Sequence, residues 1–166
     1  MSDRDYDRGA ERHLVVLRNE SLVVGVAPHL GGRVVVLRRP DGANVLQAES
    51  TQWDPSRNPA PEPAPDADWV TLNGHIVWVG PQSAWWLQQD VNADKRDRGS
   101  PWPPDPFLVF GRYRVLEQSP TRVVFRSPES PVSGLVLTKT VDVGENRVQL
   151  TAEARNIREE PISWDL

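Results

Sequence analysis

The fold class is decided by HLVVLRNESLVVGVAP, residues 13–28, in which two valine-rich runs flank a short polar turn. Residues 13–19 and 21–28 have the composition of β-strands, and Asn19-Glu20 stands between them as a tight turn. Two such runs joined by a short connection pair as an antiparallel hairpin. The stretch therefore predicts a sheet protein.

Further extended runs recur along the rest of the chain. Residues 33–39 follow the Gly31-Gly32 break, and the last long run, 146–155, alternates apolar with polar side chains as a half-buried strand does. The other predicted extended segments are 69–80, 107–117, 121–127, 134–143 and a short piece at 162–164. No segment keeps a 3.6-residue apolar period, so we expect an all-β, antiparallel β-sandwich.

The predicted strands are interrupted by two irregular regions. Residues 49–68 are rich in proline and cannot sustain a sheet ladder, and residues 88–106 form the second region. Residues 1–12 have almost nothing to bury and are expected to form a disordered tail. We therefore expect a single domain over residues 13–166.

Composition removes several classes of function. The net charge is -4 and no basic cluster is present, which argues against nucleic acid as a partner. No apolar run approaches the roughly 20 residues that cross a bilayer, and the N-terminus lacks the apolar segment of a secretory signal, so we expect a cytoplasmic protein. The histidines lack metal-ligand spacing and no cofactor motif is present, so neither metal nor cofactor is expected. A small polar molecule fits this composition better.

The candidate site lies in LNGHIVWVGPQSAWW, residues 72–86. As a strand, this stretch places Leu72 and Trp78 on one face and Asn73 and His75 on the other. We expect Trp78 to pack in the core. The His75 imidazole admits two interpretations: a residue satisfied by its neighbours, or a group that exchanges a proton with a sugar oxygen.

The same neighbourhood offers the residue types that bind sugars. Trp85 and Trp86 are adjacent, so an extended chain points them to opposite sides; one would pack and the other would face a cleft. Trp102 lies in a proline-stiffened segment and either plugs the sandwich or holds a sugar ring. Sugar C–H groups favour the electron-rich indole face, while Asn73 and Gln82 suit the hydroxyls.

Three segments together resemble a known family. They are LRNESLVVGVAPHLGGRVVVLRRPDGANVL (17–46), NGHIVWVGPQ (73–82) and WPPDP (102–106). In this order they resemble the N-terminal part of the galactose mutarotase-like superfamily, including its Gly-Gly-Arg turn and its G-x-N-x-L element, here Gly42, Asn44 and Leu46. The resemblance extends over about residues 13–165, and it implies a shortened mutarotase-like sandwich that binds a carbohydrate.

In catalytic members of that superfamily, a carboxylate takes the proton of the anomeric hydroxyl and a histidine protonates the ring oxygen, which gives aldose 1-epimerase chemistry. The resemblance assigns Arg33 to sugar binding and His75 to the active cleft. Gly74-His75 reverses the His-Gly order of those members. They are also longer and carry their carboxylate base in the second half, so here Asp105 or Asp90 would have to serve.

Three functions remain open from the sequence. The first is a carbohydrate-binding, mutarotase-like domain, whose catalytic form would act on the anomeric carbon of an aldose. The second is a non-catalytic sugar-binding or sensing module, and the third is a truncated structural remnant whose rings all lie in the core. A shortened sandwich leaves strand edges unpaired, so self-association into a homo-oligomer is also expected.

Overall fold

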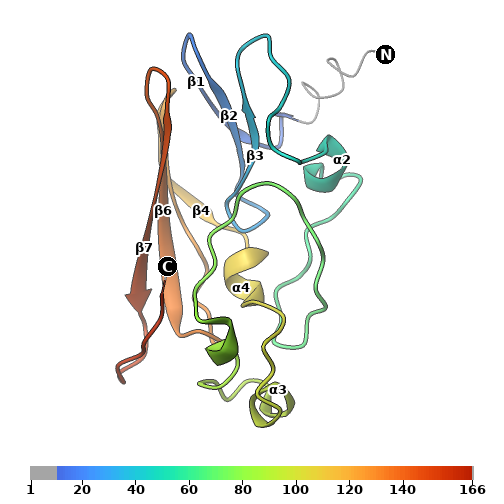
Figure 1. Ribbon diagram of the computed structural model, residues 1–166, viewed down its shortest axis with the longest axis vertical. Helices are drawn as coiled ribbons and strands as arrows, with labels where there is room; N and C mark the ends of the chain where they lie inside the picture. The colour runs from blue at the N-terminus through green and yellow to red at the C-terminus, as the bar shows by residue number, and fades with distance from the viewer. Residues whose placement is uncertain (1–10, 166) are drawn as a thin grey trace.

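The computed structural model describes residues 11–165, and two antiparallel sheets face each other within them (Figure 1). The smaller sheet has the order β1 (Val15–Arg18), β2 (Val23–Ala27), β3 (Arg33–Arg38). The larger sheet has the order β4 (Arg114–Gln118), β5 (Arg122–Arg126), β6 (Leu135–Val143), β7 (Val148–Asn156). The expected all-β sandwich is confirmed.

The opening hairpin forms where the sequence predicts it. β1 pairs with β2 from Val15↔Val26 to Arg18↔Val23. The Asn19 side chain closes the turn, because its Oδ1 accepts hydrogen bonds from the backbone N–H groups of Ser21 and Leu22. β3 then pairs with β2, as expected for residues 33–39. Of the expected tail, residues 1–10 lie outside the described residues, while Glu11 forms an ion pair with Arg38 at 3.0 Å.

The turn between β2 and β3 requires two glycines. Gly31 and Gly32 both have positive φ, at 69° and 60°. A Cβ on Gly31 would lie 2.2 Å from the carbonyl oxygen of Val109, and a Cβ on Gly32 would lie 2.3 Å from the Phe125 ring. The turn can therefore pack against both the Val109 backbone and the larger sheet only with glycine at these two positions.

The inner face of β6 organises the core. Its inward residues alternate along the strand and are all buried: Leu135, Leu137, Lys139, Val141 and Val143. The C-terminal half packs against the smaller sheet, and the N-terminal half packs against irregular segments that contribute Trp85, Trp86 and Leu108. Figure 1 shows this division: β6 and β7 extend well below β1 to β3, which lie beside only their upper part.

Short helical segments interrupt the irregular regions: α2 (Ser50–Trp53), η1 (Gln82–Ala84), α3 (Ala93–Asp97) and α4 (Pro106–Val109). Two strand predictions were therefore wrong. Residues 69–80 make only the isolated bridges Val34↔His75 and Gly80↔Asp165. The segment 107–117 begins as α4 and becomes a strand only at β4, because Asp105 caps the helix and Pro106 suits its first turn.

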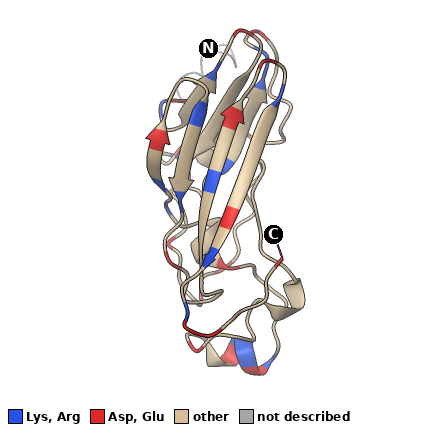
Figure 2. Cartoon of the chain, turned by 90° about the vertical axis from the view of Figure 1, so that its left-hand side faces the viewer, with Lys and Arg blue, Asp and Glu red and all other residues tan. Residues whose placement is uncertain are grey.

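The surface mixes charges of both signs. Figure 2 shows Lys and Arg interspersed with Asp and Glu over the outer face of the larger sheet. Arg122 on β5 pairs there with Asp142 on β6 at 2.6 Å. Within residues 11–165, no helix is long and apolar enough to cross a membrane.

The outer edge of β3 generates the first prediction. The half-buried Asn44 donates from Nδ2 to the Val35 carbonyl at 2.8 Å and accepts the Leu37 N–H at 2.9 Å, so its amide replaces a neighbouring strand. Asn44→Ala should lower the free energy of unfolding by about 1–3 kcal/mol, because it leaves backbone groups without partners. Urea denaturation measures this change. Asn146→Ala, at an exposed turn, is the control, and an equal loss in both variants would contradict the role of Asn44.

Candidate ligand-binding site

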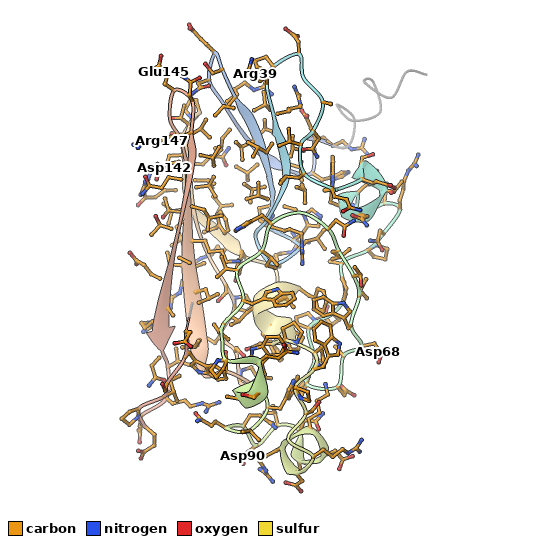
Figure 3. The ribbon with its side chains drawn as sticks, in the orientation of Figure 1. Arg39, Asp68, Asp90, Asp142, Glu145 and Arg147 are labelled. Atoms are coloured by element: carbon orange, nitrogen blue, oxygen red, sulfur yellow. The ribbon has the colours of Figure 1, made fainter. Side chains whose placement is uncertain are left out.

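Aromatic rings from distant parts of the chain meet beside α4. We call these rings the tryptophan cluster: Trp69, Trp78, Trp85, Trp102 and Phe110. They come from the segment after the proline-rich region, from residues 78 and 85 on either side of η1, from the proline-stiffened segment and from the end of α4. Aromatic side chains gather around α4 in Figure 3, with Asp68 labelled at the outer edge of that region.

The cluster is held by edge-on and tilted ring contacts. Trp69 lies 4.8 Å from Trp102 between ring centroids, and Trp78 lies 5.8 Å from Trp85. Most of these pairs are edge-to-face, an arrangement that the ring quadrupoles favour. Because each tryptophan contacts at least two other rings, the orientation of each ring is fixed by its neighbours.

The cluster has a buried base and an exposed surface. Trp85 is 3% exposed and anchors the base, where its Nε1 donates to the Val79 carbonyl at 2.6 Å. Trp78 and Trp102 are 40% and 41% exposed and lie 6.2 Å apart. Two indole rings are thus presented to solvent by a rigid aromatic support.

The structure corrects two expectations about tryptophan, and it also locates Trp102, for which two interpretations were open. Trp85 and Trp86 are both buried, so neither faces a ligand, whereas one of them was expected to do so. The 3-10 turn η1 places both rings inward, and the Trp86 Nε1 donates to the Pro103 carbonyl. Trp78, expected in the core, instead lies at the surface of the cluster because residues 69–80 do not form a strand of either sheet. Trp102, for which a plug and a ligand platform were both open, packs against Trp69 and Trp85 and is still 41% exposed.

Polar groups lie along the same segments. Gln82 is exposed and its Nε2 donates to the Pro101 carbonyl at 3.0 Å, which ties η1 to the segment that carries Trp102. Asp68 is exposed next to Trp69. Asn73 is half-buried, and its backbone N–H donates to the Gln52 Oε1 at 3.4 Å. Gln82 and Asp68 therefore offer hydrogen-bonding groups close to the rings.

Asp105 has a structural role. Its buried carboxylate accepts the Phe107 N–H at the start of α4, the Ser133 N–H and the Ser130 hydroxyl. Burial raises the pKa of Asp105, and these hydrogen bonds oppose that rise. The expectation that Asp105 faces a ligand as a base is therefore not supported, because all the polar contacts of its carboxylate are internal to the fold. Asp90, the other candidate, is exposed and pairs with Arg96 at 2.6 Å.

His75 and Arg33 lie on paired segments but differ in exposure. The bridge Val34↔His75 sets residues 73–76 along the edge of β3. His75 is exposed, as a proton-exchanging group requires, whereas Arg33 is only 2% exposed. The Arg33 Nη1 donates to the Leu72 carbonyl at 2.7 Å. Arg33 therefore does not contact a surface ligand in this conformation.

A second buried cation, Lys139, was not singled out in the sequence. It is 1% exposed, donates from Nζ to the Gly31 carbonyl at 2.9 Å and lies 4.6 Å from the centre of the Tyr113 ring. Burial, together with the charge of Arg33, lowers the pKa of Lys139 to about 7. The sequence does contain a signal for the burial of Lys139, because this residue is in phase with Leu137 and Val141 on the inward face of β6.

Two open hollows lie elsewhere on the surface. The larger, about 560 Å³, lies between residues 87–96 and 158–162 and includes Asp90. The smaller, about 360 Å³, lies between the hairpin ends of the two sheets and is lined partly by Arg38, Arg39 and Arg147. Figure 3 labels Arg39 and Arg147 at that upper end. Neither hollow is lined by a ring of the tryptophan cluster, whose Trp78 and Trp102 are exposed at the surface.

The fold and the cluster define a class: a two-sheet antiparallel sandwich with a tryptophan-rich surface at the end that the smaller sheet leaves uncovered. The chain belongs to the family described as a domain of unknown function, DUF4380, whose model matches residues 13–166. No curated protein and no solved structure matches the chain.

Lys139 gives a prediction about pH. Between about pH 7 and the ordinary lysine pKa of 10.5, the unfolded chain holds a proton at this residue that the folded chain does not, so the free energy of unfolding rises with pH in that window. From about pH 7 to 9 the rise should be about 2 kcal/mol at most. Urea denaturation across this range measures it.

Lys139→Met should remove most of that rise, because the variant keeps an apolar stem and loses the titrating amine. Lys95→Met is the comparison: burial also lowers the pKa of Lys95, but Lys95 is only partly buried and lies against the Trp86 ring at 4.0 Å, so its loss should remove much less of the rise. A rise that persists in Lys139→Met would show that another group causes it.

Proposed function

We propose that the chain is a carbohydrate-binding domain in which Trp78 and Trp102 stack on sugar rings. The observation that carries this proposal is the exposure of these two rings, 40% and 41%, on a support of buried aromatic side chains. A large apolar ring exposed to water is unfavourable, and two neighbouring ones mark a binding surface more often than a core.

The chemistry of the surface matches a sugar. The C–H groups on one face of a pyranose ring pack against indole, and the hydroxyls at its rim need donors and acceptors. Asp68 and Gln82 supply both kinds of group near the rings. Because the surface is open, it suits an oligosaccharide that lies across it better than a monosaccharide enclosed in a pocket.

The resemblance to the galactose mutarotase-like superfamily supports the same ligand class. It rests on the Gly31-Gly32-Arg33 turn and on residues 73–82 and 102–106. The antiparallel sandwich is compatible with it. The last two segments carry Trp78, Gln82 and Trp102, which are the exposed groups of the candidate site.

Aldose 1-epimerase activity is the second candidate, and the exposed His75 is the observation that favours it. The reaction also needs a carboxylate that takes the proton of the anomeric hydroxyl. Asp105 is committed to capping α4 and to Ser130 and Ser133. Non-catalytic binding therefore has the better support.

Substitution of the exposed rings tests the binding proposal. Trp102→Ala and Trp78→Ala should each weaken oligosaccharide binding about tenfold, which corresponds to about 1.4 kcal/mol. Isothermal titration calorimetry with a panel of soluble neutral oligosaccharides measures the affinity. Leu116→Ala, which removes an equally exposed apolar side chain on β4, is the control. Binding that is unchanged in both tryptophan variants would contradict the proposal.

Anomer exchange separates the two candidates. Proton exchange NMR on an aldose panel should show no acceleration by the purified chain, because the proposed site only binds. Acceleration that disappears in His75→Ala, while oligosaccharide affinity is retained, would establish the epimerase instead. One series of spectra therefore distinguishes non-catalytic binding from epimerase activity.

A further inference from the structure

Arg33 and Lys139 lie near each other at the junction of the two halves of the core. Lys139 lies on β6 between Leu137, which packs against the irregular segments, and Val141, which packs against the smaller sheet. Arg33 begins β3 directly after the Gly31-Gly32 turn, and Gly31 accepts the hydrogen bond of Lys139. The charge of Arg33 contributes to the lowered pKa of Lys139, so the two cations interact electrostatically.

The guanidinium of Arg33 is only partly satisfied. Its Nη1 donates to the Leu72 carbonyl, whereas Nε and Nη2 are buried and have no hydrogen-bond partner among the described residues. Nε and Nη2 form one edge of the guanidinium group. Their parallel N–H groups match the two oxygens of a carboxylate or phosphate, the bidentate arrangement that arginine forms best.

Neither cation has an anionic partner in the part of the chain that the structure describes. No ion pair within residues 11–165 includes Arg33 or Lys139. A buried guanidinium without a counter-charge is strongly unfavourable because it loses its hydration. The same loss lowers the pKa of Lys139 to about 7, and an anion beside Lys139 would favour its charged form. A buried anion would offset that cost and would occupy the free donors.

The segment that covers Arg33 is lightly held. Residues 72–76 belong to neither sheet, and their backbone contacts with the rest of the fold are the Val34↔His75 bridge, the Asn73 contact with Gln52 and the Leu72 contact with Arg33 itself. Gly74 lies within this segment at φ 97°. Outward movement of the segment would break few hydrogen bonds, and its main cost would be exposure of the buried Leu72 side chain.

We propose that Arg33, through its Nε and Nη2, and Lys139 together bind one oxyanionic group of a small molecule, which enters when residues 72–76 move outward. Carboxylate and phosphate share the chemistry that this edge recognises. The site does not depend on the tryptophan cluster. It implies that a ligand of this protein can carry a carboxylate or phosphate group.

Calorimetry with three probes tests the site at a fixed, low ionic strength near neutral pH. Inorganic phosphate reports a phosphate group, glucuronate reports a carboxylate on a sugar, and glucose is the uncharged control for glucuronate. Phosphate or glucuronate should bind and raise the thermal midpoint, and glucose should do neither. The anion that binds with the higher affinity shows whether the site prefers a phosphate or a carboxylate group. If neither anion binds, the proposal is overturned.

Substitutions of the basic residues test where the anion binds. Arg33→Lys keeps the charge but loses the bidentate edge, and Lys139→Met keeps the stem but loses the charge; each should weaken anion binding at least tenfold. Lys139→Met serves where Arg33→Lys does not fold. Arg147→Lys alters the exposed hollow between the hairpin ends and should leave the affinity unchanged.

The controls also separate this site from the proposed carbohydrate surface. Trp102→Ala should retain phosphate or glucuronate binding while it weakens neutral oligosaccharides. Anion binding that survives both Arg33→Lys and Lys139→Met, or that is lost in Arg147→Lys, would overturn the proposal by placing the anion on surface arginines.

Discussion

The structure depends on covering the inner face of β6 along its whole length. This strand is nine residues long and buries every second side chain. The smaller sheet reaches only its C-terminal half, and an apolar face left open to water would be unfavourable. The irregular segments cover the rest with Trp85, Trp86 and Leu108. Without a second sheet at this end, large rings fill the space, and the position of the tryptophan cluster follows from that need.

The same constraint explains why ring burial and ring exposure occur together. Trp85 fills the core at the base of the cluster, and it also fixes Trp78 and Trp102 above it. A loop by itself would hold an exposed indole weakly, because side-chain freedom opposes any single orientation. Packing against buried rings removes much of that freedom. The surface that we propose for sugar binding is thus the outer layer of a structural plug, and the two roles share residues.

The junction between the two halves of the core contains basic side chains, Arg33 and Lys139, where most of the core is apolar. A close approach of the sheets at Gly31-Gly32 brings a backbone carbonyl within reach of Lys139, and Arg33 follows immediately on the same turn. Apolar side chains would be the stable choice at these inward positions, since burial of two like charges is unfavourable. Two cations in place of apolar residues indicate a requirement other than stability. Binding of an oxyanionic ligand would be such a requirement, and it agrees with the unpartnered Nε and Nη2 of Arg33.

Local patterns in the sequence are sufficient to predict most of the strands. Alternation and turn residues located the hairpin of β1 and β2, then β3, β5, β6 and β7, because these elements depend on local patterns and on burial of one face. Those patterns did not determine residues 69–80 or the sides taken by Trp85 and Trp86, since valine-rich composition is the same for a strand and for an extended segment with a single bridge. Long-range packing sets which rings are exposed, encloses the Asp105 carboxylate with Ser130 and Ser133, and brings Arg33 near Lys139. Those outcomes depend on segments distant in sequence whose contacts no local pattern records.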